Sequence, residues 1–95
     1  MIKSFGSKPT EALYFGYWRE AGSIPQNLWK SAIRKLDMLN YAAELRGLLS
    51  PPGNRFERLS GNFKGRYSIR INDQFRIIFW FEDGHAYEVE IIDYH

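Results

Sequence analysis

Hydrophobic residues recur at two different spacings along the chain, and the change between them divides it into a helical part and a strand part. Between residues 28 and 43 they fall every three or four positions, which places them on one face of a helix. Between residues 55 and 92 hydrophobic and polar residues alternate, which is typical of strands with one face in the core. The segment SPPGN at 50–54 separates the two parts, because its two prolines cannot continue a helix.

This pattern predicts an α+β fold in which an N-terminal strand and two helices pack on an antiparallel β-sheet. Before the break we expect three elements: a strand at 1–5, a helix at 10–17, and a long helix that kinks near residue 40 and extends to 49. Ser7 and Ser23 are the expected N-caps of the two helices. After the break we expect four strands joined by short turns, at 55–59, 66–71, 75–81 and 86–92.

The tight turn between the last two strands sets their register. It places Arg76 opposite Ile91, and the preceding hairpin places Arg70 opposite Arg76. Because side chains alternate along a strand, Asp93 and His95 are then expected on the same side as Arg76. Simple pairing therefore gathers guanidinium, carboxylate and imidazole groups at one end of one face.

The same register puts Glu88 and Glu90 on the core side of the sheet, where carboxylates without partners are unfavourable. A β-bulge in the last strand, or an edge position for that strand, would relieve this conflict and would also re-aim the residues at the end of the chain. The sequence leaves both arrangements open.

The composition is that of one folded domain over residues 1–95, with 44% hydrophobic and 17% aromatic residues. There is no cysteine, which excludes disulfides and thiolate metal sites, and two histidines are too few for a histidine metal cluster. We therefore expect no metal and no cofactor. The N-terminus lacks a signal-peptide pattern and no apolar run reaches about 18 residues, so a cytoplasmic protein with no membrane partner is expected.

The net charge is only +2, but the bases are concentrated between residues 55 and 76. This range holds six basic residues against two acidic ones, which indicates either a patch for an anionic partner or a solvated sheet face. The six are Arg55, Arg58, Lys64, Arg66, Arg70 and Arg76.

The residue types at the end of the predicted sheet suit cleavage of a phosphodiester without a metal. Such cleavage needs a base for the ribose 2′-hydroxyl, an acid for the leaving oxygen and fixed cations around the phosphorane. Histidine exchanges protons near neutral pH, arginine binds phosphate through a rigid fork, and tyrosine donates to phosphate or stacks on a base. Each of these residues also has a structural explanation, as a terminal tail, a solvated strand edge or packing at a strand end. The residues concerned are Arg70, Arg76, Tyr94 and His95.

Several segments of the chain resemble the HigB-type toxins of the RelE superfamily, the plasmid maintenance killer proteins. The most specific are LSGNFKGRYSIRINDQFRIIF at 59–79 and IIDYH at 91–95, and MIKSF at 1–5 and SPPGNR at 50–55 also agree. The resemblance covers essentially the whole chain. It implies a RelE-like microbial RNase toxin fold over residues 1–95.

The resemblance further implies the toxin of a type II toxin–antitoxin system, which inhibits translation and growth. Toxins of this kind are usually ribosome-dependent messenger-RNA endoribonucleases that cut in the A site without a metal. The implied partners are the ribosome with its mRNA and a HigA-like antitoxin with a helix-turn-helix domain. Operator DNA would be bound only through that antitoxin.

By position, the resemblance assigns the catalytic residues Arg76, Asp93, Tyr94 and His95. Arg76 would stabilise the phosphate and His95 would transfer a proton. Asp93 would orient or tune His95, and Tyr94 would contact the scissile nucleotide. The residues expected to bind RNA are Arg58, Lys64, Arg66 and Arg70.

One position departs from the family pattern. Many of these toxins carry a histidine shortly after the leucine that corresponds to Leu59, whereas this chain has Ser60. Without that imidazole we expect a slower or more selective nuclease. The alternative is a non-catalytic module that binds RNA or protein and inhibits growth through another target, with Trp80, Tyr87 and Tyr94 as its interface.

Overall fold

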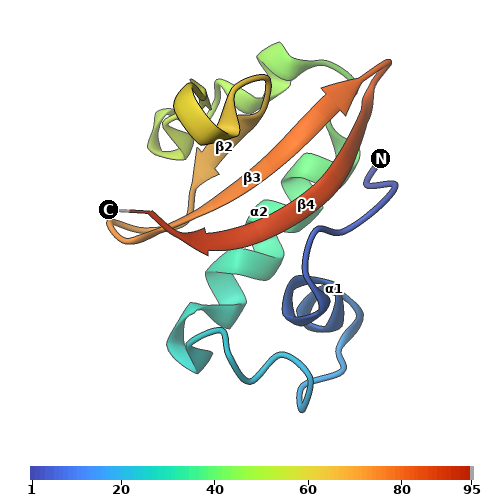
Figure 1. The fold of residues 1–95 in the computed structure, drawn as a ribbon, viewed down its shortest axis with the longest axis vertical. Helices are drawn as coiled ribbons and strands as arrows, with labels where there is room; N and C mark the ends of the chain where they lie inside the picture. Colours follow the sequence, from blue (N-terminus) through green and yellow to red (C-terminus); the bar gives the residue numbers. More distant parts are fainter. Residues whose placement is uncertain (95) are drawn as a thin grey trace.

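A computed structural model describes residues 1–94, in which two α-helices precede a four-stranded antiparallel sheet (Figure 1). The elements are α1 (Lys8–Phe15), α2 (Trp29–Tyr41), β1 (Glu57–Arg58), β2 (Tyr67–Arg70), β3 (Phe75–Glu82) and β4 (His85–Asp93). The strands pair in the order β1-β2-β3-β4, which confirms the predicted α+β fold and its antiparallel sheet. His95, the residue predicted to transfer a proton, lies outside the described residues.

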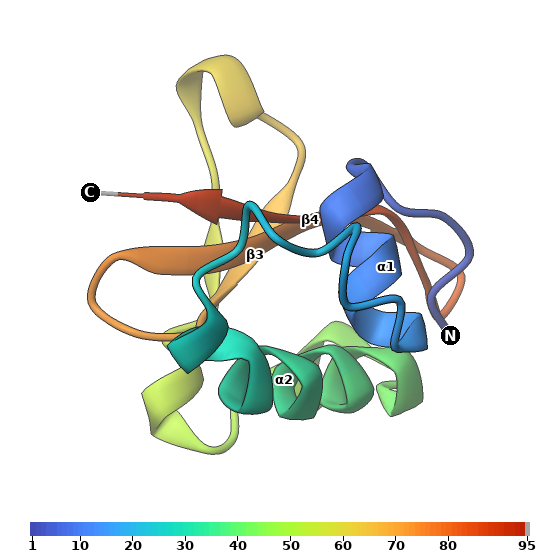
Figure 2. The same cartoon turned by 90° about the horizontal axis from the view of Figure 1, so that it is seen from below.

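The two faces of the sheet are covered differently. α2 runs across one face, and the connection between β1 and β2 rises from the other face (Figure 2). The core lies under α2, where Ile69, Ile77 and Phe79 are fully buried against Leu36 and Leu39. The odd-numbered residues of β2 and β3 therefore form the core face, as the alternation predicts.

α1 begins at its predicted cap. Ser7 has extended backbone angles, and its hydroxyl accepts a hydrogen bond from the N–H of Thr10 at 3.3 Å. Pro9 occupies the first turn, where its missing N–H costs nothing. The helix ends at Gly16, whose φ of 83° is a left-handed conformation that glycine adopts without steric penalty.

α2 begins later than the sequence indicates, and Ser23 is not its cap. The chain runs with a ψ of 129° through Pro25 into a 3-10 turn, Gln26–Leu28, and α2 follows directly with no side-chain cap. The prediction of a cap at Ser23 was wrong because Pro25 starts this shorter turn instead of the α-helix. Among residues 1–94, no helix has both the length and the apolar character needed to span a bilayer.

α2 also ends earlier than predicted. It stops at Tyr41, since Ala42 has a ψ of 118°, and only a 3-10 turn, Leu45–Leu48, follows in place of continued helix. This change of direction brings Leu48 back into the core, where its side chain is fully buried. Burial of that leucine favours the broken path over a longer, more exposed helix.

The N-terminal segment covers one edge of β4. The predicted strand at 1–5 is reduced to two isolated parallel bridges, from Ile2 to Ala86 and from Phe5 to Val89. Backbone hydrogen bonds of 2.7–3.0 Å join the two segments. An uncovered edge strand invites pairing with other chains, and this segment prevents it along the first half of β4.

β4 carries a β-bulge near its centre. Glu88 has a φ of 51°, and the pairing with β3 shifts between Ile78 and Trp80. Trp80 still faces Tyr87, as the turn predicts. Beyond the bulge the register moves by one residue, so the carboxylate of Glu88 is exposed and not directed into the core.

The shifted register overturns the predicted pairing at the end of β4. Arg76 faces Ile92, and the expected pairing with Ile91 was wrong. Phe75 faces Asp93, which therefore lies on the other side of the strand from Arg76. The bulge is the physical reason, because one extra residue reverses the direction of every later side chain.

Thr10 secures the second half of the β4 edge, and its removal should lower stability. Its fully buried hydroxyl accepts a hydrogen bond from Ile91 N–H at 3.0 Å and lies 2.8 Å from Ser7 Oγ. We expect Thr10→Val to lower the free energy of unfolding by about 1–3 kcal/mol, because a buried N–H loses its acceptor. Urea unfolding checks this. Ser23 is exposed, so Ser23→Ala should keep the free energy of unfolding within about 0.5 kcal/mol of wild type. A Thr10→Val variant as stable as wild type would contradict the role of Thr10 at the β4 edge.

Candidate active site

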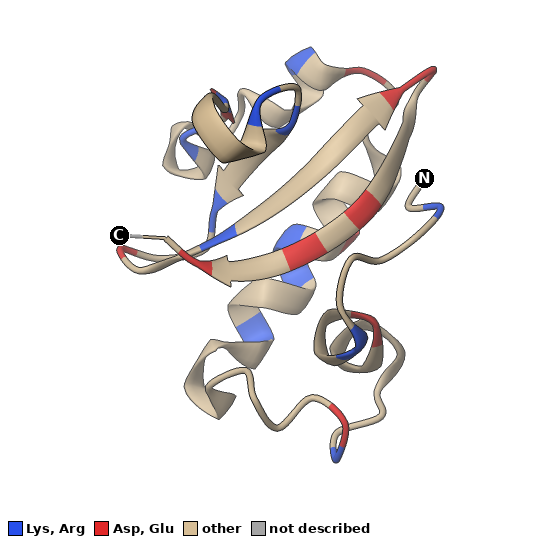
Figure 3. Ribbon diagram, in the orientation of Figure 1, with Lys and Arg blue, Asp and Glu red and all other residues tan. Residues whose placement is uncertain are grey.

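A polar pocket of about 230 Å³ opens on the sheet face opposite α2. It lies where the turn between β2 and β3 meets the C-terminal end of β4, and Figure 3 shows basic residues on the adjacent strand ends. The lining residues are Arg55, Glu57, Arg70, Asn72, Asp73, Arg76 and Tyr94.

Arg76 is the most buried of these, with only 6% of its surface exposed. Its Nη1 lies 2.7 Å from Glu57 Oε1, and its Nη2 donates a hydrogen bond to the carbonyl oxygen of Arg55. Its guanidinium carbon lies 5.6 Å from the centroid of the Tyr94 ring. A carboxylate and a carbonyl from the segment 55–57 and an aromatic ring from the end of β4 thus fix the position of one cation.

Burial lowers the pKa of Arg76 from its ordinary value, while the Glu57 carboxylate acts in the opposite direction. A guanidinium keeps its proton in proteins, so the pocket holds a fixed positive charge at neutral pH. Five N–H donors are available on this group, and its bonds to Glu57 and Arg55 leave others for an anion.

Glu57 is the candidate residue that the sequence pattern did not single out. It lies in the two-residue strand β1 opposite Ser68, and its side chain is 50% exposed while bonded to the buried Arg76. Strand alternation contained the signal, since Ser68 and Arg70 share a side of β2 and Glu57 is paired to that side. A carboxylate held in this way is open to solvent and able to accept a proton.

Tyr94, and not Asp93, is placed over Arg76 by the bulge. Asp93 Oδ2 accepts a hydrogen bond from Gln74 Nε2 at 3.0 Å, and Asp93 does not line the 230 Å³ pocket. The expectation that Asp93 shares a side with Arg76 was therefore wrong. The backbone N–H of Tyr94 donates to the carbonyl of Gln74 at 2.6 Å, which ties the end of β4 to the β2–β3 turn.

Arg70 lies opposite Arg76, as predicted, and is one of three arginines that line the pocket, with Arg55 and Arg76. Its Nη2 is bonded to the carboxylate of Asp73 in the turn. Asn72 orders the same turn, because its Oδ1 accepts hydrogen bonds from two backbone N–H groups at 2.8–2.9 Å.

The other predicted RNA-binding residues lie outside this pocket, in or beside the connection between β1 and β2. The guanidinium carbon of Arg66 lies near two rings, 5.8 Å from the centroid of Phe63 and 5.1 Å from that of Trp80. Arg58 and Lys64 line a separate hollow of about 520 Å³ together with Ser60. The position at which the resembling toxins carry a histidine thus belongs to that hollow.

The groups in the 230 Å³ pocket suit an anionic ligand whose reaction involves proton transfer. They supply three guanidinium groups, two carboxylates of which Glu57 is the one bonded to Arg76, and a phenol. In the described part of the chain, no three histidine, aspartate or glutamate side chains are grouped so that they could hold a metal ion.

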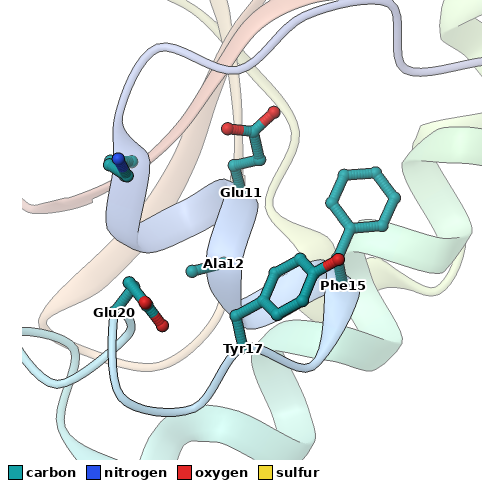
Figure 4. A pocket seen from close by; sticks show the side chains of 6 residues that line it. Glu11, Ala12, Phe15, Tyr17 and Glu20 are labelled. Atoms are coloured by element: carbon teal, nitrogen blue, oxygen red, sulfur yellow. The ribbon is translucent and has the colours of Figure 1, made fainter.

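A different hollow, of about 440 Å³, lies beside α1. Figure 4 shows the side chains that line it, which project from α1 and from the loop that follows. They are Lys8, Glu11, Ala12, Phe15, Tyr17 and Glu20. With two carboxylates against one ammonium group, this hollow has no electrostatic attraction for a phosphate.

Proteins of known sequence and structure resemble this chain over most of its length. A curated relative, Toxin HigB-1 of Vibrio cholerae, is 49% identical over 63 residues, which are 66% of this chain and 66% of that protein. An uncharacterized protein of Haemophilus influenzae is 39% identical over 71 residues, or 75% of this chain and 70% of its own length.

Solved structures agree on the fold. The YoeB–YefM complex from Staphylococcus aureus contains a chain that superposes with a TM-score of 0.61 at 22% identity, covering 100% of this chain and 98% of that one. The YoeB dimer from the same organism gives a TM-score of 0.58 at 21% identity, with 99% and 94% covered. The family model for HigB-like toxins, described as the RelE-like toxin of the type II toxin–antitoxin system HigB, matches residues 3–95. The chain therefore belongs to the HigB-like toxins of type II toxin–antitoxin systems.

Proposed function

We propose that this toxin is an endoribonuclease that cuts messenger RNA in the ribosomal A site by acid–base chemistry without a metal. The observation that supports this most is the arrangement around Arg76, a buried cation bonded to Glu57 beneath the ring of Tyr94. The pocket places a phosphate-binding group within 2.7 Å of a group that can accept a proton. Cleavage of RNA requires both at the same phosphodiester.

In the proposed reaction, an RNA phosphate replaces the Glu57 carboxylate on Arg76. Glu57 then takes the proton of the ribose 2′-hydroxyl, and the 2′-oxygen attacks the phosphorus. Arg76 and Arg70 stabilise the charge of the phosphorane, and the 5′-oxygen leaves with a proton delivered by His95. The products are a 2′,3′-cyclic phosphate and a 5′-hydroxyl end.

The remaining predicted residues have secondary parts in this proposal. Asp93 orients His95, and Tyr94 contacts the scissile nucleotide. Arg58, Lys64 and Arg66 bind RNA around the site, so binding should weaken steeply with salt. Ser60 supplies no imidazole, and the exposed Glu57 carries the base function that the histidine would otherwise support.

The proposed partners are the ribosome with its mRNA and a HigA-like antitoxin with a helix-turn-helix domain. The structural neighbour YoeB was solved together with YefM as a toxin–antitoxin complex, which supports an antitoxin partner for this chain as well. Operator DNA would be bound through the antitoxin alone. The proposal treats residues 1–95 as one toxin domain that acts in the cytoplasm.

The test is direct cleavage of a defined mRNA on purified ribosomes. We expect wild-type toxin to cut at the A-site codon, with 2′,3′-cyclic phosphate ends that are mapped by primer extension and end analysis. The same mRNA without ribosomes is the control and should be cut far more slowly. Growth arrest without any cut would instead support a non-catalytic module that binds RNA or protein.

A further inference from the structure

A hollow of about 540 Å³ adjoins the candidate active site. It is lined by Phe63, Ile92, Asp93 and Tyr94. Tyr94 also lines the 230 Å³ pocket, so the two cavities share a wall. A nucleotide whose phosphate is bound at Arg76 would place a neighbouring base within reach of this hollow.

Phe63 forms the far wall, and the structure holds it firmly in place. The N–H of Phe63 donates to the carbonyl of Ser60 at 3.3 Å, and its carbonyl accepts from Arg66 N–H at 3.0 Å. Its ring lies 5.8 Å from the guanidinium carbon of Arg66, which itself lies 5.1 Å from the centroid of the Trp80 ring. The loop is therefore attached to the sheet by two cation–π contacts of Arg66.

Gly65 completes the attachment of this loop to the sheet. Its φ is 94°, and a Cβ at this position would lie 2.7 Å from Cζ3 of Trp80. Only glycine allows the backbone to approach the indole so closely. The wall of the hollow is thus a preorganised aromatic surface, because its loop is held by Trp80 and not left free.

The charge around the hollow favours a nucleic acid over an apolar peptide. Arg66 lies against Phe63, and Arg76 lies against Tyr94, so each ring has a cation beside it. Aromatic rings with adjacent cations bind unpaired bases by stacking while the cations attract the phosphates. The hollow beside α1 also has aromatic rings, but Glu11 and Glu20 there outnumber the single ammonium group of Lys8.

We propose that the hollow between Phe63 and Tyr94 binds an unpaired nucleobase next to the scissile phosphate, with the Phe63 ring as its stacking surface. This subsite rests on the proposed function, since it holds the base that flanks the bond to be cut. It recognises the face of the base by stacking, so it increases affinity for single-stranded RNA in general.

The experiment combines a protein change with a substrate change. Synthetic mRNAs with one abasic nucleotide in the A-site codon are cut on purified ribosomes by wild type and by Phe63→Leu, which stays apolar but has no ring. We expect an abasic nucleotide beside the cut to lower wild-type kcat/KM about 10-fold, and Phe63→Leu to lose about 10-fold on intact mRNA. The two losses should not multiply, because both remove the same stacking interaction.

Two further variants separate stacking from structure. Phe63→Trp keeps a ring and should restore the wild-type rate and the sensitivity to the abasic nucleotide. Phe15→Leu removes an exposed ring at the end of α1 and should change neither the rate nor the sensitivity to the abasic nucleotide. Full activity of Phe63→Leu on intact mRNA, or losses that multiply to about 100-fold, would overturn the subsite.

A binding measurement keeps the subsite testable if wild-type toxin cuts no mRNA. A short single-stranded 2′-deoxy oligonucleotide cannot be cut through a 2′-hydroxyl, and its binding is followed by Trp80 fluorescence in a variant with Trp18 and Trp29 replaced by Phe. We expect Phe63→Leu to raise Kd about 10-fold in this background. If wild-type toxin cuts no mRNA but Phe63→Leu still binds the oligonucleotide more weakly, only the proposed function is refuted. If Phe63→Leu leaves Kd unchanged, the subsite is refuted.

Discussion

Arg76→Ala should lower the cleavage rate on ribosome-bound mRNA by about 10²- to 10³-fold and remove growth arrest. The guanidinium of Arg76 is held by the Arg55 carbonyl and the Tyr94 ring before any substrate binds, so it is already in position for the charge of the phosphorane once the phosphate has replaced Glu57. Single-turnover cleavage and growth after induction measure the two effects. Because the cation is buried, its loss should reduce kcat more than binding.

Two controls define this result. Arg76→Lys keeps the charge but loses the planar fork, and we expect it to remain at least about 10-fold below wild type. Arg46→Ala removes an exposed arginine that pairs with Glu44, and it should leave cleavage unchanged. The assignment of Arg76 fails if Arg76→Ala folds, as judged by its thermal melt, and still arrests growth.

Glu57→Gln should lower kcat by about 10²- to 10⁴-fold while KM falls or stays the same. The amide cannot accept the 2′-hydroxyl proton, which removes general-base catalysis. It also carries no charge to compete with phosphate for Arg76, so substrate binding should not weaken. Measured values of kcat and KM on ribosome-bound mRNA separate these two effects.

The matched control is Asp73→Asn in the same pocket. Asp73 is nearly fully exposed and bonded to Arg70, so we expect its kcat to stay within a few-fold of wild type. A Glu57→Gln variant with wild-type kcat would show that Glu57 only holds Arg76 in place. Another group would then have to act as the base.

The sheet is the part of the fold that the chain specifies most directly. Its alternation predicts which residues of β2 and β3 are buried, and Ile69, Ile77 and Phe79 are indeed in the core. Asp83 and Gly84 both have a positive φ and form the turn of the last hairpin. This turn depends on these two residues alone, so the sequence predicts it directly. The cap of α1 at Ser7 is local in the same sense.

Interactions between distant segments decided the parts that differ from the prediction. Residues near Tyr41 are compatible with a longer helix, but burial of Leu48 ends it there. The 3-10 turn at Gln26–Leu28 likewise replaces the helix start expected at Ser23. Hydrophobic periodicity predicts which side of a helix faces the core, but it does not predict at which residue packing in the core ends the helix.

The candidate site shows the same division between local and tertiary information. Residue type and the family resemblance predict Arg76 and Tyr94 as site residues, and hairpin pairing places Arg70 opposite Arg76. The bulge at Glu88 then decides that Tyr94, and not Asp93, lies over Arg76. Alternation along a strand assumes that no residue is inserted. It therefore predicts the wrong side for every residue that follows the bulge.

By itself, the sequence determined the order of the elements, the core face of the sheet and the residue types at its end, because these depend on neighbours within a few positions. Only the tertiary structure brought Glu57 to Arg76 and placed Phe63 across a hollow from Tyr94. Both depend on how the loop between β1 and β2 folds over the sheet. The path of that loop is set by packing of Gly65 and Arg66 against Trp80. These contacts join distant segments, so a local sequence pattern does not predict them.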